Sequence, residues 1–338
     1  MAEAMRAVRL NEIGGPEKLH VEQIPKPEPQ AGEVLIKVAR AAFNRRDVFI
    51  TQGLYPGIQL PVTPGSDGFG HVAALGTGAK APPVGTPVVM NPEIGWEDDP
   101  STLSANARIL GMPIDGTFAE YVIAPAENVF AKPANLSDDE AAAIPLAGLT
   151  AYRAAFTRGG LTKDDVVFIP GIGSGVQTMV LSYAVHVGAR TIVTSGSDEK
   201  LAHAKALGAS EGVNYKTNPD WHKDVRKLSD GGPTLTVDCN GGEVFARALD
   251  IARFGGRVVS YGGTNGDAKI RPFSIFWKHL SVLGTSMGSP SDFAAMLALF
   301  GSGLKPVVDR VFPMDDVVDA AERVLKGEQM GKVVLAIA

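Results

Sequence analysis

The sequence predicts an α/β protein with two domains, one rich in β-strands and one built on a doubly wound parallel sheet. The first observation is a buried strand, a glycine turn, a helix and a second strand, in that order, between residues 166 and 200. The second is a change of rhythm near residue 127, where short strands separated by glycine and proline give way to alternating helices and strands. With 338 residues, the chain is long enough for two cores.

The β-rich domain is predicted to comprise residues 1–126. Residues 34–38 alternate in polarity and are typical of a strand, and short strands between so many glycines and prolines favour a small barrel. The C-terminal segment, residues 288–338, is expected to return to this domain. Residues 127–287 then form the second domain, with about six parallel strands. Further predicted elements are a strand at 120–124, helices at 292–300 and 315–326, and a last strand at 332–337.

The glycine turn predicts a dinucleotide-binding unit. Gly171, Gly173 and Gly175 let the backbone approach a pyrophosphate closely and permit positive φ angles. A helix that begins near Val176 directs unpaired N–H groups at such an anion. Gly188 stands where the C-cap of that helix is expected. An ordinary glycine turn is the alternative, but the strand before it and the helix after it favour the dinucleotide.

The end of the second strand favours NADP(H) over NAD(H). In units that bind NAD, an acidic residue at this point accepts a hydrogen bond from the ribose. Here Ser195 and Ser197 stand at the strand end, and Lys200 follows. Hydroxyl groups and a cation attract a 2′-phosphate, whereas a carboxylate repels it. Asp198 is interpreted as a charge that stabilises a helix N-terminus, and a solvated helix lysine is the alternative for Lys200.

Composition excludes several other classes. The net charge is −5, and no cluster of lysine and arginine indicates a nucleic-acid partner. Cys239 is the single cysteine, so no intramolecular disulfide forms and a reducing compartment is expected. No apolar stretch is long enough to span a membrane, and no signal peptide is evident. We therefore expect a cytoplasmic protein that acts on a small molecule.

Four motifs, in this order, resemble the medium-chain dehydrogenase/reductase superfamily over essentially the whole chain. They are Gly-Gly-Pro-Glu-Lys-Leu at 14–19, Pro-Gly-Ser-Asp-Gly at 64–68, Gly-Thr-Phe-Ala-Glu-Tyr at 116–121 and Leu-Thr-Ala-Tyr-Arg-Ala at 149–154. The resemblance implies an oxidoreductase with a GroES-like catalytic domain and a Rossmann cofactor domain. One departure is Gln177, which stands where the family usually has Gly or Ala and puts close packing between helix and strand in doubt.

The departures from the family pattern point away from zinc. Asn44, Ser66 and Leu146 occupy the places of the catalytic-zinc ligands, and leucine cannot coordinate a metal. Residues 91–111, which match the structural-zinc lobe, contain no cysteine. Arg46 and Phe49 replace the proton relay. The chain therefore resembles the zinc-free quinone oxidoreductase (ζ-crystallin-like) branch, and no metal is expected.

The resemblance assigns roles residue by residue. Asn44 and Thr150 are expected at the nicotinamide, and Tyr55 and Asn44 are the candidate catalytic residues. The expected pyrophosphate contacts are Gly171, Gly173, Ser174, Gly175 and Val176, and the expected 2′-phosphate contacts are Ser195, Ser197, Lys200 and Tyr215. The remaining cofactor contacts, just past strand ends, are Asn240, Tyr261, Gly262, Gly263 and Thr285. Arg45 and Arg46 are interpreted as supporting or surface cations, Asp67 as a structural carboxylate and Cys239 as a small buried residue.

Three functions stay open. The leading hypothesis is an NADPH-dependent reductase of quinones or conjugated enones, because such acceptors are already activated for hydride and need no Lewis acid. The alternatives are a zinc-independent alcohol or carbonyl dehydrogenase, and an NADPH-binding protein without turnover in a crystallin-like or regulatory role. The strand at 281–284 resembles the dimerising strand of the family, so a homodimer is expected.

Overall fold

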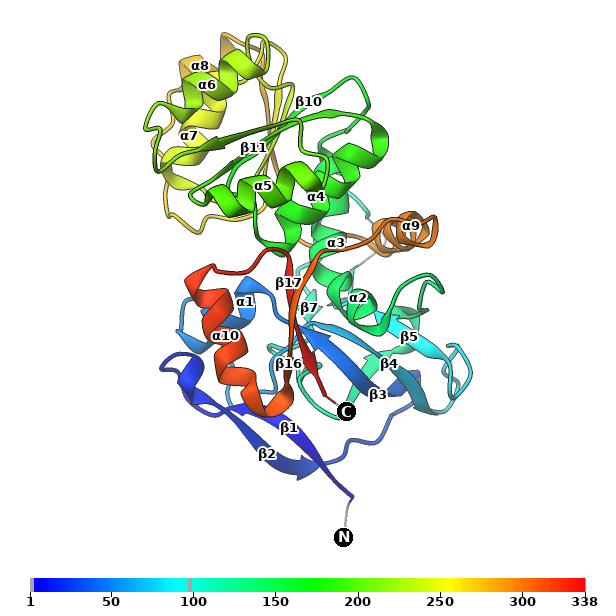
Figure 1. Cartoon of the computed structure of the whole chain (residues 1–338). Coiled ribbons are helices and arrows are strands. Elements are labelled where there is room, and N and C mark those ends of the chain that lie inside the picture. Colours follow the sequence, from blue (N-terminus) through cyan, green and yellow to red (C-terminus); the bar gives the residue numbers. More distant parts are fainter. Residues whose placement is uncertain (1–2, 97–98, 338) are drawn as a thin grey trace. The chain divides into compact units, whose positions relative to one another are not determined.

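The computed structural model describes residues 3–96 and 99–337 and divides into two compact units. Unit 1 comprises Met1–Gly148 and Ser289–Ala338, and unit 2 comprises Leu149–Gly288. Figure 1 shows each unit with its own sheet and covering helices. The predicted α/β fold class is confirmed. The predicted start of the cofactor domain at 127 differs from this division, because the segment before Gly148 packs on the sheet of unit 1 through its helix α2 (Asp138–Ala143).

Unit 1 is organised around a seven-stranded, mostly antiparallel sheet. Its order is β16-β17-β3-β4-β5-β9, and β8 also pairs with β3. The C-terminal strand β17 runs antiparallel to β3, with Val334 opposite Ala42, so the end of the chain is part of this sheet. The strands are β3 (Glu33–Ala42), β4 (Asp67–Leu75), β5 (Pro87–Met90), β8 (Tyr121–Pro125), β9 (Val129–Ala131), β16 (Val308–Pro313) and β17 (Lys332–Ala336).

Smaller elements surround this sheet. Two two-stranded sheets flank it, β1 (Ala4–Leu10) with β2 (Leu19–Pro25), and β6 (Glu93–Ile94) with β7 (Arg108–Ile109). The helices are α1 (Arg45–Thr51), α2, α3 (Pro145–Tyr152, which ends in unit 2), α9 (Pro290–Gly301) and α10 (Val317–Lys326). The predicted capping box at the start of α2 is present, since the Ser137 hydroxyl accepts from the Glu140 N–H and the Glu140 carboxylate accepts from the Ser137 N–H.

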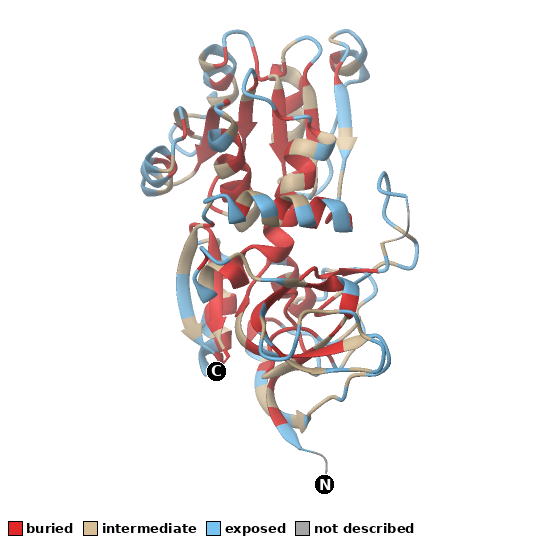
Figure 2. Cartoon of the chain, turned by 90° about the vertical axis from the view of Figure 1, so that its right-hand side faces the viewer, coloured by how far each residue is buried: buried red, intermediate tan, exposed pale blue. Residues whose placement is uncertain are grey.

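Unit 2 is a six-stranded sheet in which every neighbouring pair is parallel. Its order is β12-β11-β10-β13-β14-β15, the doubly wound order with a switch point between the first and fourth strands. The inner strands are buried while β15 is exposed (Figure 2). The strands are β10 (Val166–Ile169), β11 (Arg190–Ser195), β12 (Glu211–Asn214), β13 (Leu235–Asp238), β14 (Arg257–Ser260) and β15 (Ser281–Gly284).

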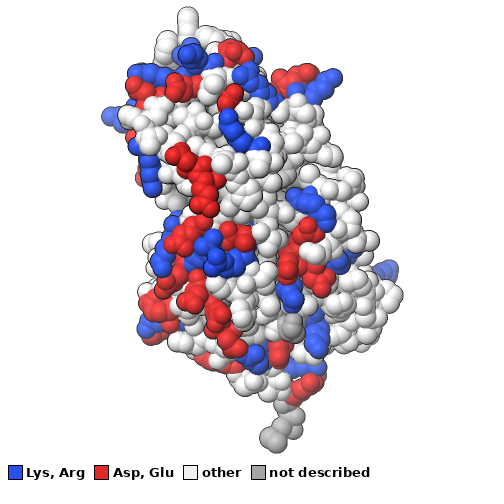
Figure 3. Space-filling view, in the orientation of Figure 1, with Lys and Arg blue, Asp and Glu red and all other residues white. Residues whose placement is uncertain are grey.

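Helices cover both faces of this sheet, and a π-helical segment, Arg153–Arg158, follows α3. The helices are α4 (Gly175–Val187), α5 (Asp198–Ala206), α6 (Trp221–Leu228), α7 (Gly242–Ile251) and α8 (Pro272–Phe276). Among the described residues, no helix is long and apolar enough to cross a membrane. On the face drawn in Figure 3, acidic and basic side chains are interspersed.

Candidate active site

The glycine turn of unit 2 lies between the end of β10 and the start of α4. Gly171 and Gly173 have φ angles of 73° and 136°, a region that side chains other than glycine rarely adopt. Ser174 is the N-cap of α4, and its hydroxyl accepts from the N–H of Gln177 at 3.3 Å. Gly175 and Val176 open the helix, where backbone N–H groups have no partner within the helix. The turn therefore has the conformation that a pyrophosphate site requires.

Gln177 does not weaken this turn. Its side chain is fully buried, and its Nε2 donates to the carbonyl oxygens of Pro170 at 2.8 Å and Val237 at 3.2 Å. The amide thus ties α4 to the ends of two strands, β10 and β13, and the expected packing problem does not arise. Cys239 Sγ lies 3.6 Å from the same nitrogen, and the residue is half-buried rather than buried as expected.

The end of β11 carries the predicted 2′-phosphate group of residues. The Ser195 hydroxyl accepts from the N–H of Ser197, and the Ser197 hydroxyl accepts from the N–H of Lys200 at the start of α5. One carboxylate oxygen of Asp198, Oδ1, accepts a hydrogen bond from the Asn214 amide at 2.7 Å. That oxygen is therefore engaged by Asn214. The carboxylate is thus held at the helix N-terminus, in line with its interpretation from the sequence.

Lys216 belongs beside these residues and was missed by the sequence analysis. A Cβ built on Gly196 would lie 2.8 Å from Lys216 Cε and 3.0 Å from the Tyr215 hydroxyl. Both side chains therefore lie against the loop that follows β11. The register Ser195–Asn214 shows why: β11 and β12 end side by side, so residues just past each strand meet. The position of Lys216, directly after Tyr215 past the next strand, was the signal available in the sequence.

The other predicted cofactor residues lie just past the carboxyl ends of β13, β14 and β15. Asn240 donates to the Pro170 carbonyl at 3.1 Å and so adjoins the glycine turn. A Cβ on Gly262 would lie 3.0 Å from the Cys239 carbonyl oxygen, so these two strand ends are also close. The Thr285 hydroxyl is buried without a hydrogen-bond partner. Burial raises the pKa of Tyr261 well above its ordinary value, as does its neighbour Cys239.

Asn240, Tyr261 and Thr285 each follow the carboxyl end of a strand, and these strand ends share one edge of the parallel sheet. Sheets of this kind bind ligands at that edge. Gly263 follows Gly262 in the same loop. Thr150 is 95% buried on α3. The structure thus gathers the strand-end residues of the prediction, while their contact with a cofactor stays a prediction.

In unit 1 the residues at the lost zinc positions do come together. Asp67 joins two of them, since its Oδ2 accepts from Asn44 Nδ2 at 3.0 Å and its Oδ1 accepts from the Leu146 N–H at 2.6 Å. Lys332, at the start of β17, donates through Nζ to Asn44 Oδ1 at 2.7 Å and to Asp67 Oδ2 at 2.6 Å. Lys332 and Asp67 are almost fully buried. An ammonium group of the protein itself therefore binds the oxygens at this site.

The donor set does not fit zinc. The Asn44 oxygen already accepts from an ammonium group, the Asp67 carboxylate is neutralised by the same group, and Leu146 offers no ligand. Within residues 3–96 and 99–337, no group of three or more His, Cys, Asp or Glu side chains could hold a metal ion. Lys332 was not among the predicted residues. Its only signal is a lysine that opens an otherwise apolar final strand.

Arg46 lies beside this site and is buried, so of its two interpretations the supporting cation fits and the surface cation does not. Its guanidinium donates to the Ser66 hydroxyl at 2.6 Å and to the carbonyl oxygens of Leu110 and Met112 at 3.0 Å each. Its Cζ lies 5.0 Å from the ring centroid of Tyr55, the predicted substrate-orienting residue. Arg45 has a supporting role, since it donates to the Val324 carbonyl on α10.

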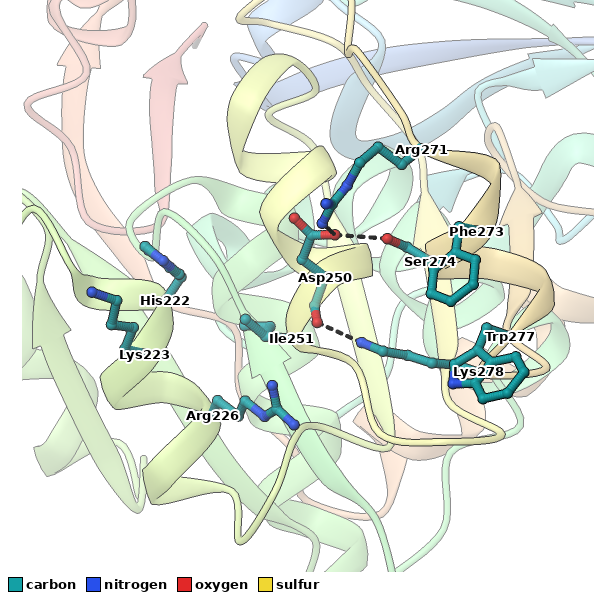
Figure 4. A pocket seen from close by; sticks show the side chains of 10 residues that line it. All are labelled: His222, Lys223, Arg226, Asp250, Ile251, Arg271, Phe273, Ser274, Trp277 and Lys278. Carbon is teal, nitrogen blue, oxygen red and sulfur yellow. Dashed lines mark hydrogen bonds and ion pairs between the residues drawn. The ribbon is translucent and has the colours of Figure 1, made fainter.

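Unit 2 also contains a cavity of about 370 Å³ between α6, α7 and α8, which Figure 4 shows. None of the predicted site residues lines it. Its polar groups are largely engaged in holding the helices together: Asp250 accepts from Arg271 and Ser274, and Lys278 donates to carbonyl oxygens at the end of α7. We therefore do not place the active site here.

Comparisons with known proteins match this architecture. The profile described as alcohol dehydrogenase GroES-like domain matches residues 30–134, and that described as zinc-binding dehydrogenase matches residues 175–302. Zinc-type alcohol dehydrogenase-like protein C1773.06c of Schizosaccharomyces pombe is 35% identical over 99% of both chains. Human quinone oxidoreductase is 29% identical over 98% of both chains. A solved structure of an NAD-dependent alcohol dehydrogenase shares 38% identity and a TM-score of 0.92 over 99% of this chain and 100% of that one.

The fold is thus that of nucleotide-dependent dehydrogenases. The chain belongs to the medium-chain dehydrogenase/reductase superfamily, with a GroES-like domain and a Rossmann domain. The name of the second profile mentions zinc, whereas Asn44, Ser66 and Leu146 do not form a zinc site. The named relatives include alcohol dehydrogenases and a quinone oxidoreductase, so oxidoreductase activity is the function that they share.

Proposed function

We propose that this protein is an NADPH-dependent, zinc-independent oxidoreductase that transfers a hydride to a quinone or an α,β-unsaturated carbonyl compound. The observation that carries the proposal is the buried Lys332 ammonium group, which binds the Asn44 and Asp67 oxygens at the lost zinc position. An alcohol is oxidised through an alkoxide, which a metal ion stabilises. A quinone or enone needs only orientation and a cationic environment, and this site contains both Lys332 and Arg46.

The cofactor assignment rests on the residues at the end of β11. Ser195, Ser197 and Lys200 lie there together, Lys216 lies against the same loop, and Asp198 is bonded to Asn214. The glycine turn and the unpartnered Thr285 hydroxyl fit a dinucleotide along the same edge of the sheet. When bound, the reduced nicotinamide supplies the hydride. The cofactor roles of Asn44 and Thr150, and the substrate-orienting role of Tyr55, stay predictions.

Binding measurements test the cofactor assignment. We expect Lys200→Ala to weaken NADPH binding by about tenfold or more while changing NADH binding little, because a cation binds the 2′-phosphate that NADH lacks. Lys216→Ala should act in the same direction. Lys205→Ala is the matched control, since Lys205 lies on the same helix, is half-exposed and pairs with Glu211. Equal losses for NADPH and NADH would contradict the assignment.

Two alternatives remain distinguishable. The names of several relatives favour an alcohol or carbonyl dehydrogenase, and that function predicts alcohol-dependent reduction of NAD(P)⁺ by this protein. A protein without turnover predicts tight NADPH binding but no oxidation of NADPH by a broad panel of quinones and enones. The proposal predicts NADPH oxidation by members of that panel and little activity with simple alcohols.

We also propose a cytoplasmic homodimer joined through β15. Among the strands that the structure describes, β15 pairs with β14 alone, which leaves its other edge open, and Val282 on it is exposed. Phe273, Phe276 and Trp277, just before it, are more than half exposed, and such apolar surface favours a second copy of the chain. Light scattering should give twice the monomer mass of 35.4 kDa, and Val282→Lys should shift it toward the monomer. An unchanged mass in that variant would contradict this interface.

A further inference from the structure

A buried charged cluster surrounds Arg46, and parts of it have no hydrogen-bond partner. Arg46 is 7% exposed and Glu93, on β6, is 2% exposed. The Arg46 Nε, both carboxylate oxygens of Glu93 and the Oδ1 of Asp47 are all buried, and none has a hydrogen-bond partner among the described residues. Buried polar groups in native proteins almost always have partners. Glu93 lies opposite Ile109 in the β6–β7 pair, next to Leu110, whose carbonyl oxygen accepts from Arg46. Four unsatisfied atoms on three neighbouring charged residues therefore call for an explanation.

The backbone holds Glu93 firmly while its carboxyl group has no partner. The Glu93 N–H donates to Asn91 Oδ1 at 3.1 Å, and the Asn128 amide donates to the Glu93 carbonyl oxygen at 2.7 Å. Neither bond satisfies the side chain. Leaving an ionised carboxylate buried and unbonded costs several kcal/mol, so packing alone would favour an apolar residue at this position.

The cluster adjoins the position that the lost zinc would occupy. Arg46 donates to Ser66, which stands at one of the three former ligand positions. On its own helix Arg46 faces Asp47, whose Oδ1 lies 4.0 Å away and whose Oδ2 caps α1 by accepting from the Asn44 N–H. The Tyr55 ring, from the segment after α1, lies against the guanidinium, and the charges of Asp67 and Lys332 also act on the Asp47 carboxyl.

We propose that Arg46 supplies, at the former metal position, the positive charge that stabilises the oxygen of the hydride acceptor, and that Glu93 sets the strength of that charge. This inference rests on the proposed function. Hydride forms the new C–H bond, the displaced π electrons move to the carbonyl oxygen, and that oxygen takes a proton from water. A fixed cation in a buried site lowers the energy of this developing anion without reorganisation.

Glu93 acts through Arg46 and is a positioning residue. When its carboxyl group is protonated, the full charge of Arg46 acts on the substrate; when it is ionised, the two charges cancel. Burial raises the pKa of Glu93 to about 7, and Arg46 opposes that rise. Burial also raises the pKa of Asp47, to about 6. The activity should therefore fall as the pH rises through about 7.

The activity test uses the full chain and five variants. We expect Arg46→Gln to lower kcat by ~100-fold, the effect of removing one stabilising donor from an anion site, and Arg46→Lys to recover most of it. Glu93→Gln should abolish the fall in kcat around pH 7. At pH 8.5, where the wild-type carboxylate is ionised, the kcat of Glu93→Gln should be roughly tenfold higher than that of the wild type. Glu127→Gln, an exposed glutamate of the same unit, should keep the wild-type pH profile. Asp47→Asn should keep the fall around pH 7.

A second measurement needs no turnover. The carboxyl infrared band of Glu93, assigned by its loss in Glu93→Gln, should titrate near pH 7 in the wild type and at higher pH in Arg46→Gln, because the variant lacks the opposing cation. If the pKa of Glu93 is the same in Arg46→Gln as in the wild type, the proposed coupling between Glu93 and Arg46 is overturned. This result does not depend on the activity of Arg46→Gln. A wild type that is active but shows the same pH profile as Glu93→Gln would overturn the inference alone. A wild type that reduces no quinone or enone would instead overturn the proposed function.

Discussion

The substitution Lys332→Met tests the interpretation of the lost metal position. Lys332 is 2% exposed and Asp67 is fully buried, and their charged groups are 2.6 Å apart. Removing one partner of a buried ion pair usually costs about 3–5 kcal/mol, because the other charge is left uncompensated. Here Asp67 keeps two donors, Asn44 Nδ2 and the Leu146 N–H. We therefore expect a loss of about 3 kcal/mol, at the lower end of that range.

Urea unfolding at pH 7.5, followed by far-ultraviolet circular dichroism, measures the free energy of unfolding of this variant. The matched control is Lys326→Met, which breaks the exposed pair with Glu322 and should change the free energy of unfolding far less. The double variant Lys332→Met with Asp67→Asn removes both charges and should recover part of the loss. A cost below about 1 kcal/mol for Lys332→Met would refute the reasoning, since it would mean that the pair is not buried or not ionised.

Four further predictions concern other parts of the chain. Gln177→Leu should lower the free energy of unfolding by about 1 kcal/mol, because the Val237 carbonyl oxygen loses its side-chain donor while the Pro170 carbonyl oxygen keeps the Asn240 amide. Gly171→Ala should weaken NADPH binding, measured by fluorescence titration, because alanine disfavours the φ of 73° that the turn needs. Glu93→Gln should stabilise the protein by about 3 kcal/mol at pH 8 and should have no such effect below pH 4. The reason is that folding raises the pKa of Glu93 from 4.5 to about 7, so ionisation of Glu93 destabilises the folded state as the pH rises through that window. Dialysis against a chelator should leave NADPH-dependent activity unchanged, and a loss that zinc restores would count against the donor-set argument.

The sequence was sufficient for the fold of unit 2 because its signals are local. A strand, a turn with Gly171 and Gly173 and a helix follow one another directly, and parallel order then follows from the handedness of such units. The residues past the strand ends, such as Asn240 and Thr285, could be assigned to one edge for the same reason. Lys216 could not be assigned in this way, because its position follows only from the pairing that places the ends of β11 and β12 side by side.

The site in unit 1 could not be predicted to the same depth because its contacts join distant segments. Lys332 lies 265 residues from Asp67 along the chain, and the pairing of β17 with β3 brings them together. The burial of Arg46 could not be predicted from the sequence, because charged side chains are seldom buried. Its partners are backbone carbonyl oxygens of residues 110 and 112, which no side-chain pattern reveals.

The most direct test of the central claim is the rate of NADPH oxidation by chelator-dialysed protein against paired panels of quinones and enones, with NADH as the comparison. Our account predicts turnover with members of these panels, a clear preference for NADPH and no dependence on added zinc. Turnover only with alcohols and NAD⁺, or only after zinc is added, would contradict it.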